Sequence, residues 1–230
     1  MDIGGRPLIQ WVWECARASG AAHVVVATDD VRVLESARGF GADAVLTGHA
    51  HASGTDRIAE VVRSRGIPPE DIVVNLQGDE PLMPPAAIGA VAAALHERAL
   101  VDMASAVAPI GSLEEFMDPN CVKALMGRDR RALYFSRAPV PWPRDSVVAG
   151  RPTAFEGAWR HIGLYAYRVR SLLQFAARPP TPLESVEKLE QLRALEYGMS
   201  IHLVALSTAP PAGVDTPEDL ARVRAHLRGA

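Results

Sequence analysis

Between residues 9 and 98 the sequence alternates short, strongly apolar runs with longer segments whose apolar residues recur at helical spacing. The short runs are rich in valine and isoleucine, and most of the longer segments end at a glycine. Strands that alternate with helices form mostly parallel sheets, because each helix carries the chain back to the same end of the sheet. We therefore expect an α/β fold with helices on both faces of the sheet. The expected strands are 23–27, 43–46 and 72–76, and the expected helices are 9–19, 31–38, 55–65 and 85–98.

The second half of the chain has a different pattern. Two apolar runs flank Gly127-Arg128-Asp129 and predict a hairpin. Proline recurs between residues 139 and 143, which excludes a central strand there, because proline has no amide hydrogen for the ladder. Thr216 and Pro217 provide a cap and a first helical residue for a last helix that extends to about residue 227. The remaining expected elements are strands at 122–126, 131–135, 161–167 and 202–206 and helices at 169–177 and 185–197.

The composition excludes several classes of protein. Hydrophobic residues make up 48% of the 230 residues, charged residues 22%, and the formal net charge is -3, which indicates a globular chain with a buried core. No long run of like charge points to a nucleic-acid partner, and no apolar stretch reaches the roughly 18–20 residues that cross a membrane. Cys15 and Cys121 form neither a disulfide framework nor a metal-type pair, so we expect reduced thiols and a cytoplasmic location.

The loop that comes after the run 72–76 is the strongest candidate for a functional site. Its sequence is Gln77-Gly78-Asp79-Glu80-Pro81. Ligands of open α/β sheets bind at the carboxyl ends of strands, and a carboxylate there can hold Mg²⁺ against a phosphate. Gly78 would let a ligand approach the backbone closely. The alternative is an ordinary strand-to-helix turn, in which Asp, Gly and Pro are common.

Three further motifs are suggestive, and each has a structural alternative. Ser53-Gly54-Thr55-Asp56-Arg57 at a helix start could bind an anion, or could simply cap the helix. Asp215 precedes the cap residue Thr216 and is not needed for the cap, so it could face a ligand. The segments 136–142 and 161–167 could carry ligand-binding residues, although a histidine and a tyrosine on a strand are more often core residues. Residues 190–193 on a helix would by default form a solvated face.

Taken in order, these stretches resemble the family of 3-deoxy-manno-octulosonate cytidylyltransferases, also called CMP-KDO synthetases. The combination of Asn75-x-Gln77-Gly78-Asp79-Glu80-Pro81 with Ser53-Gly54-Thr55-Asp56-Arg57 is specific for this family, and the resemblance covers nearly the whole chain. The resembling segments are 2–9, 26–29, 51–57, 75–81, 134–142, 161–167, 189–193 and 213–219.

The resemblance implies a Rossmann-like nucleotidyltransferase fold. It would have a mixed, mostly parallel sheet flanked by helices, and a small β-containing lobe for dimerisation and sugar binding. The implied enzyme is a cytoplasmic homodimer that transfers a cytidylyl group from CTP to KDO. The products are CMP-KDO and pyrophosphate, and the pathway served is lipopolysaccharide biosynthesis. The implied cofactor is Mg²⁺.

The resemblance also assigns roles to individual residues. Asp79 and Asp215 match the catalytic, metal-binding carboxylates of the family. The positions matching the nucleotide pocket are Ser53, Gly54, Arg57, Gln77 and Gly78. The positions matching the sugar-acid pocket are Arg137, His161, Tyr165, Glu190 and Gln191.

The N-terminus departs from the family pattern. The family opens with an apolar strand and a basic, glycine-containing loop that binds the triphosphate, and the segment from Asp2 to Ile9 matches the family's next segment after that loop. We therefore expect a single nucleotidyltransferase domain over residues 1–230 that lacks this first strand and loop, through a misassigned start, a truncation or degradation of the gene. Because losing even one preorganised charge-stabilising donor costs roughly 10²–10³ in rate, we expect the 230-residue chain to be poorly active.

Two other functions remain open from the sequence. The chain could activate another acidic sugar with CTP, of the 8-amino-KDO or sialate type, because such enzymes share the nucleotide pocket and differ in the sugar pocket. Alternatively, it could be a catalytically impaired remnant that acts as a binding protein.

Overall fold

The computed structural model describes residues 1–51 and 53–228. Its centre is a six-stranded sheet. Five of its strands are neighbours in the order β12 (Ile201–Ala205), β6 (Met103–Pro109), β11 (Ala158–Arg168), β7 (Lys123–Met126) and β8 (Ala132–Ser136). The sixth strand, β5 (Ile72–Asn75), also pairs with β11. β5, β6, β7 and β12 run in one direction, whereas β11 and β8 run in the other. The expected mixed sheet is confirmed, but antiparallel neighbours predominate because β11 lies between strands of the opposite direction.

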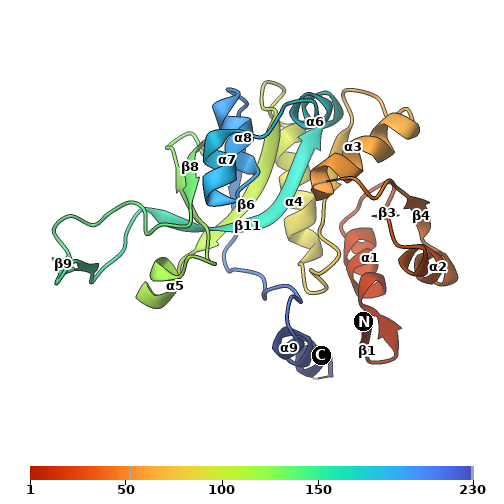
Figure 1. Cartoon of the computed structure of the whole chain (residues 1–230), viewed down its shortest axis with the longest axis horizontal. Helices are drawn as coiled ribbons and strands as arrows, with labels where there is room; N and C mark the ends of the chain where they lie inside the picture. Colours follow the sequence, from red (N-terminus) through yellow and green to blue (C-terminus); the bar gives the residue numbers. More distant parts are fainter. Residues whose placement is uncertain (52, 229–230) are drawn as a thin grey trace.

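Helices cover both faces of this sheet, as the alternation of strands and helices predicts (Figure 1). Along β6, Ala104, Ala106 and Ala108 pack with α4 (Pro85–His96), whereas Met103 and Val107 face the opposite side. That opposite side is covered by α3 (Gly54–Ser64), α6 (Val169–Ala176) and α8 (Gln191–Glu196). The alternation of side chains along β6 therefore divides the core into two layers, one on each face of the sheet.

A second, two-stranded parallel sheet lies beside α1 (Leu8–Ala18) and α2 (Val31–Gly39). It consists of β3 (Val25–Thr28) and β4 (Asp43–Leu46), and no strand of the described residues joins it to the larger sheet. Val26, Leu34 and Ala44 form a separate small core there. Asp30 caps α2 by accepting a hydrogen bond from the Arg32 amide.

The helix predicted over 185–197 is wrong. The chain instead forms α7 (Pro182–Glu187) and α8, and it breaks at Lys188, whose φ is 54°. The expectation of a solvated face at 190–193 is wrong as well, because Gln191 and Arg193 are only 3% and 6% exposed. Two further elements, β6 and the short helix α5 (Leu113–Met117), do not follow from the sequence pattern. Strand β6 consists of small residues without strand-like alternation of polarity, so its pattern is weak.

The last helix, α9 (Pro217–Arg228), returns to the N-terminal hairpin of β1 (Asp2–Ile3) and β2 (Arg6–Pro7) (Figure 1). Ile3 and Val223 share a small apolar cluster, and Arg224 donates two hydrogen bonds to the Asp2 carbonyl oxygen. At the far side of the molecule, β9 (Val147–Val148) and β10 (Arg151–Pro152) form a hairpin that projects from the body (Figure 1).

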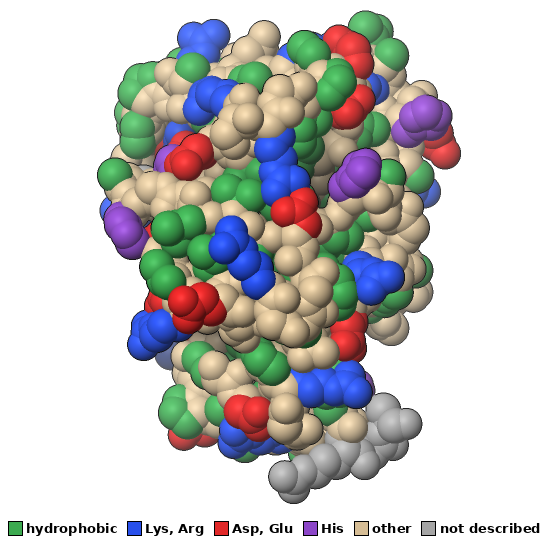
Figure 2. All heavy atoms as spheres, turned by 90° about the vertical axis from the view of Figure 1, so that its right-hand side faces the viewer, with side chains coloured by type: hydrophobic (Ala, Val, Ile, Leu, Met, Phe, Trp, Pro, Cys, Tyr) green, Lys and Arg blue, Asp and Glu red, His purple; other side chains and the backbone are tan. Residues whose placement is uncertain are grey.

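On the face that carries α2 and α3, basic and acidic side chains are interspersed, without a large patch of one sign (Figure 2). Within the described part of the chain, no helix is both long enough and apolar enough to span a bilayer.

Candidate active site

The loop 77–81 leaves the carboxyl end of β5 and meets the segment that precedes α9. The Val214 amide donates a hydrogen bond of 2.8 Å to the Asp79 carbonyl oxygen. A Cβ atom on Gly213 would lie 3.0 Å from that carbonyl oxygen and 3.3 Å from the Glu80 carboxyl group. Only glycine therefore fits at position 213 without displacing the loop. The fold thus brings together Asp79 and Asp215, the two carboxylates singled out in the sequence.

Three carboxyl groups lie close enough at this junction for their charges to interact. Burial, followed by the nearby Asp215 charge, raises the pKa of Asp79 above its usual value. Burial, followed by the charges of Asp79 and Asp215, raises the pKa of Glu80 to about 7. Each shift means that a negative charge is costly here unless a cation or a hydrogen-bond donor compensates it. This junction therefore favours a positively charged ligand.

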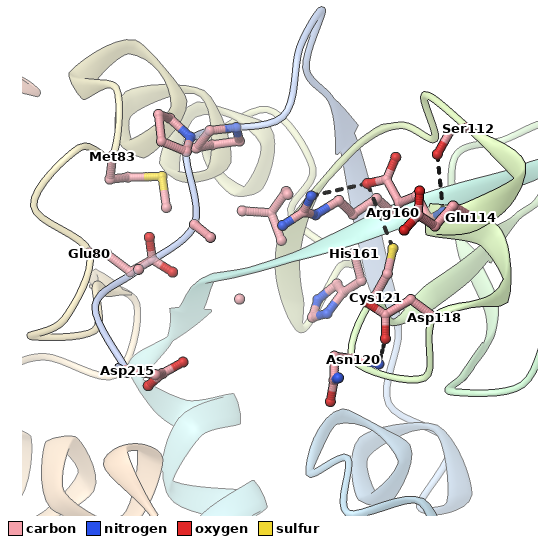
Figure 3. Close-up of a pocket in the computed structure, with 17 residues that line it drawn as sticks. Glu80, Met83, Ser112, Glu114, Asp118, Asn120, Cys121, Arg160, His161 and Asp215 are labelled. Atoms are coloured by element: carbon pink, nitrogen blue, oxygen red, sulfur yellow. Dashed lines mark hydrogen bonds and ion pairs between the residues drawn. The ribbon is translucent and has the colours of Figure 1, made fainter. Parts of the chain in front are cut away.

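A cavity of about 590 Å³ opens beside these carboxylates (Figure 3). Glu80 and Asp215 lie on one side, and Arg160 and His161 lie on the other. The Arg160 guanidinium forms a 3.0 Å ion pair with Glu115, and its charge opposes part of the rise in the pKa of Glu80. The cavity thus has carboxylates on both walls, and the wall opposite Glu80 and Asp215 adds one cation and one imidazole to Glu114, Glu115 and Asp118.

His161 is held in its wall by polar and aromatic contacts. Its Nε2 lies 2.9 Å from the Ser105 hydroxyl, and its ring centre lies 4.9 Å from that of Phe135, edge-on, and 5.4 Å from that of Tyr165, at a tilt. Burial lowers the pKa of His161 to about 3. The imidazole is therefore neutral at physiological pH, so it can serve as a hydrogen-bond donor or acceptor without adding charge.

The N-terminus of α3 lies next to the other side of the loop 77–81. A Cβ atom on Gly54 would lie 3.4 Å from the Gln77 side chain, so this glycine lets the helix end approach Gln77 closely. Ser53 caps the helix by accepting a hydrogen bond from the Asp56 amide. The cap is therefore present, and the half-buried helix terminus still faces the loop, as a phosphate site requires.

Arg57 on the first turn of α3 is anchored within the protein. Its guanidinium contacts Asp29 at 3.0 Å and the Thr47 hydroxyl at 2.5 Å. The Arg57 side chain is 19% exposed. Arg57, which was predicted to bind the nucleotide, therefore lies at the edge of the site. Its guanidinium uses part of its hydrogen-bond donors for Asp29.

The two predicted sugar-binding residues on the α7–α8 segment are buried beside α3. Thr55 donates a hydrogen bond of 2.6 Å to the Glu190 carboxylate, and burial raises the pKa of Glu190. Within the described residues, Glu190 Oε2, Gln191 Nε2 and Asn75 Nδ2 are buried without a hydrogen-bond partner. Such groups are costly when unpaired, and a polar ligand with several hydroxyl groups would satisfy them.

Arg137 follows β8 and is oriented mainly by carbonyl groups. Its Nε donates to the Glu187 carbonyl oxygen at 2.8 Å, and its Nη1 donates to the Pro119 carbonyl oxygen at 3.0 Å. No carboxylate of the described residues is hydrogen-bonded to its guanidinium, which therefore keeps charge and donors for an anionic ligand.

Some residues of this site were not identified from the sequence. Glu80 lies within the loop already singled out, and Asn75 lies within the same motif, so closer attention to the motif could have found both. Arg160 directly precedes His161 and could have been found on the same grounds. Glu187 had no signal in the sequence, since its contacts depend on the break at Lys188.

Comparison with known proteins places this geometry in a family. The model of the family described as "Cytidylyltransferase" matches residues 1–201. A 3-deoxy-manno-octulosonate cytidylyltransferase of Pseudomonas fluorescens is 51% identical over 227 residues, which cover 98% of this chain and 89% of the relative. The enzyme of the same description from Aliivibrio fischeri is 46% identical over 226 residues, which cover 98% of this chain and 90% of the relative.

Solved structures agree with these relatives. The structure of a CMP:2-keto-3-deoxy-manno-octonic acid synthetase complexed with CTP superimposes with a TM-score of 0.89 and 38% identity, covering 100% of this chain and 90% of that one. A 4-diphosphocytidyl-2C-methyl-D-erythritol synthase from Anaerococcus prevotii has a TM-score of 0.63 and 10% identity over 99% of this chain and 92% of its own. The second likeness shows a shared fold alone.

Proposed function

This chain belongs to the cytidylyltransferase family of the 3-deoxy-manno-octulosonate cytidylyltransferases, and we propose from this premise that it transfers the cytidylyl group of CTP to KDO. The products are CMP-KDO and pyrophosphate, and the activated sugar serves lipopolysaccharide synthesis. The proposal rests mainly on one observation: the loop 77–81 meets the segment before α9, which brings Asp79 and Asp215 together. The N-terminus of α3 lies on one side of this junction, and the polar cavity lies on the other.

The reaction is a single displacement at phosphorus. The anomeric hydroxyl oxygen of the sugar forms a bond to the α-phosphorus of CTP, the bond to the pyrophosphate oxygen breaks, and the hydroxyl proton is released. Such a transfer needs alignment of the two substrates and stabilisation of negative charge, and it needs no covalent bond to the enzyme. The residues of the site have to supply this alignment.

The nucleotide would be read where α3 meets the loop 77–81. The Gly54 terminus supplies amides and a helix dipole for an anion, and the glycines at 54 and 78 allow close approach. Gln77 offers an amide group for hydrogen bonds, and Ser53 and Arg57 border the same end of α3.

The sugar would be held by groups of complementary chemistry. The Arg137 guanidinium suits the sugar carboxylate, because its planar fork matches two carboxylate oxygens. Glu190 and Gln191 offer unpartnered buried atoms for sugar hydroxyl groups. His161 and the Tyr165 ring shape the neighbouring wall.

Asp79 and Asp215 would hold Mg²⁺. Their oxygen donors are those that Mg²⁺ prefers, and a cation would relieve the repulsion that raises the pKa of Asp79 and Glu80. The described residues contain no cluster of three or more potential ligands, so phosphate oxygens and water would complete the shell. When bound, the ion would neutralise charge on the phosphates and favour loss of the sugar's hydroxyl proton.

We also propose that the protein works as a cytoplasmic homodimer. Both cysteines are free thiols, which suits a reducing compartment. Leu133 on β8, Val148 in the projecting hairpin and Val186 on α7 are 64%, 67% and 81% exposed, and they offer apolar area for contact with a second copy.

The direct test is to incubate the purified chain with CTP, KDO and Mg²⁺, and to detect CMP-KDO by mass spectrometry together with pyrophosphate release. We expect Asp79→Asn to lower kcat by roughly 10²–10³-fold, because it removes a charge at the reacting phosphate while keeping the shape of the side chain. We expect its melting temperature to be unchanged or raised, since Asp79 is repelled by Asp215 in the absence of a cation.

A matched control is Asp71→Asn, at an exposed position before β5, which should keep wild-type turnover. Wild-type turnover by the Asp79→Asn variant would contradict the metal assignment. A panel containing KDO, 8-amino-KDO and a sialic acid would decide the sugar. A preference for 8-amino-KDO or for the sialic acid would show that this sugar, and not KDO, is the acceptor.

A further inference from the structure

Glu187 makes an unusual set of contacts with the residues that follow β8. One carboxylate oxygen accepts a hydrogen bond of 2.6 Å from the Ser136 hydroxyl, and the other accepts one of 2.9 Å from the Arg137 backbone amide. The Glu187 carbonyl oxygen accepts the bond from Arg137 Nε at 2.8 Å. Two of these contacts fix the backbone and the side chain of Arg137, and the third holds the preceding residue, Ser136.

These contacts leave the charge of the Arg137 side chain available. The Glu187 carboxylate binds the backbone amide of Arg137, whereas among residues 1–51 and 53–228 only neutral carbonyl groups bind its guanidinium. Of the five N–H donors on a guanidinium group, two are engaged in these bonds, so the others can meet a ligand. Glu187 thus orients the cation without forming the bidentate ion pair that would compete with a substrate carboxylate.

A second buried cation makes the carboxylate of Glu187 more important. Lys123 is fully buried, and its Nζ donates to the Asp118 and Cys121 carbonyl oxygens at 2.7 and 2.6 Å. Lys123 lies opposite Ser136 in the β7–β8 pairing, and it is close enough to Arg137 and Glu187 for their charges to act on its pKa. Together with Asp118, the negative charge of Glu187 therefore offsets repulsion between two neighbouring cations.

Glu187 also connects two walls of the proposed sugar pocket. It is the last residue of α7, and the left-handed Lys188 after it turns the chain into the segment that carries Glu190 and Gln191. A displacement of Glu187 would therefore move Arg137 relative to these two residues.

We propose that Glu187 is a positioning residue for KDO binding, which holds the Arg137 guanidinium at the place where the sugar carboxylate binds. This inference rests on the proposed function, because it takes Arg137 as a ligand of the sugar acid. The inference predicts that replacing Glu187 impairs the use of KDO but not that of CTP. It also predicts that this defect appears only when Arg137 is present.

The test compares steady-state kinetics of Glu187→Ala and Glu187→Gln with those of the wild type. We expect Glu187→Ala to raise the KM for KDO about tenfold or more, with the KM for CTP within about twofold, because only the sugar pocket is disturbed. Glu187→Gln should lie between the wild type and Glu187→Ala, since it keeps the shape and one acceptor. Glu196→Ala removes an exposed carboxylate from α8 and should behave as wild type.

A double-mutant cycle with Arg137→Ala separates positioning from a purely structural role. If Glu187 acts through Arg137, adding Glu187→Ala to Arg137→Ala should raise the KM for KDO no further. Additive effects, or an equal rise in both KM values, would overturn the inference. Circular dichroism and melting temperature verify that each variant is folded, and Glu187→Gln serves for the cycle if Glu187→Ala does not fold.

If the proposed function were wrong, the kinetics would differ from those expected if only the role of Glu187 were wrong. An Arg137→Ala variant with an unchanged KM for KDO would remove Arg137 from the sugar site. A strong effect of Arg137→Ala, together with wild-type kinetics of both Glu187 variants, would overturn the inference alone.

Discussion

At the scale of single residues, His161 shows how burial selects the chemistry of a side chain. It lines an otherwise charged cavity, yet burial keeps its imidazole neutral. A protonated imidazole here would be deprived of solvent and would lie on the same wall as the Arg160 cation. Its position on the strand predicted at 161–167 followed from the sequence, but its neutrality follows from Phe135 and Tyr165, which surround it in the folded chain.

The lowered pKa of His161 makes stability depend on pH. The unfolded chain binds a proton at His161 below about pH 6.5, whereas the folded chain does so only near pH 3, so unfolding is favoured as the pH falls through this interval. The expected loss is at most about 1.4 kcal/mol for each pH unit below 6.5, and contact with the cavity would reduce it.

The measurement is urea unfolding of the wild type and His161→Gln at several pH values between 4 and 7. The variant should lose stability less steeply as the pH falls. His23→Gln alters an exposed histidine and should follow the wild-type slope. Identical slopes for the wild type and His161→Gln would contradict the assignment.

At the scale of elements, the break between α7 and α8 decides much of the site. In a continuous helix over 185–197, Glu187 and Glu190 would lie on the same straight helix. The turn at Lys188 instead directs Glu187 to Arg137 and Glu190 to Thr55. The two short helices are held together by Arg193, whose Nε and Nη2 donate to the Glu184 carboxylate at 2.8 and 2.5 Å. The side chains of this pair are 7% and 12% exposed.

We expect Arg193→Leu to lower the free energy of unfolding by about 3–5 kcal/mol, because it leaves the Glu184 carboxylate buried without its partner. Adding Glu184→Met should recover most of the loss, since an apolar pair buries no charge. Urea denaturation of the two variants checks both values. No recovery in the double variant would indicate that Arg193 stabilises the fold chiefly through its contact with the Phe175 ring at 4.6 Å.

The elements that could be predicted from the sequence are those with strong local signals. Helices α1 to α4, strands β3 to β5 and the β7–β8 hairpin lie within a few residues of their predicted ranges, because each has apolar periodicity and a glycine, a proline or a cap at its end. β6 could not be found, since Ala104, Ala106 and Ala108 become strand residues only by packing against an alanine-rich α4. Lys188 likewise takes its left-handed conformation from the packing of α7 and α8.

At the scale of the whole molecule, the two separate sheets leave strand edges open. β3 and β4 pair only with each other, and β5 pairs only with β11, among the strands of the described residues. Each of these strands therefore presents one row of backbone donors and acceptors without a partner strand. Open edges of this kind can pair with another copy of the chain.

We expect the 230-residue chain to form species larger than a dimer as its concentration rises, measured by size-exclusion chromatography with light scattering. Val25→Lys places a charge on the half-buried face of β3 and should reduce this association, because edge lysines discourage strand pairing. Val31→Lys on α2, at a position that is 50% exposed, adds the same charge away from the edge and should not reduce it. A purely dimeric wild type at all concentrations would contradict the prediction.

The contact between Val214 and Asp79 also has a consequence for biosynthesis. On the ribosome, the loop that carries Asp79 emerges long before Gly213 and Asp215, which come after the strands of the central sheet and directly before α9. A nascent chain can thus fold most of its central sheet while the site is still open on one side. We therefore expect catalytic competence to be acquired late in translation, when the segment around Asp215 has emerged and α9 docks on the hairpin of β1 and β2.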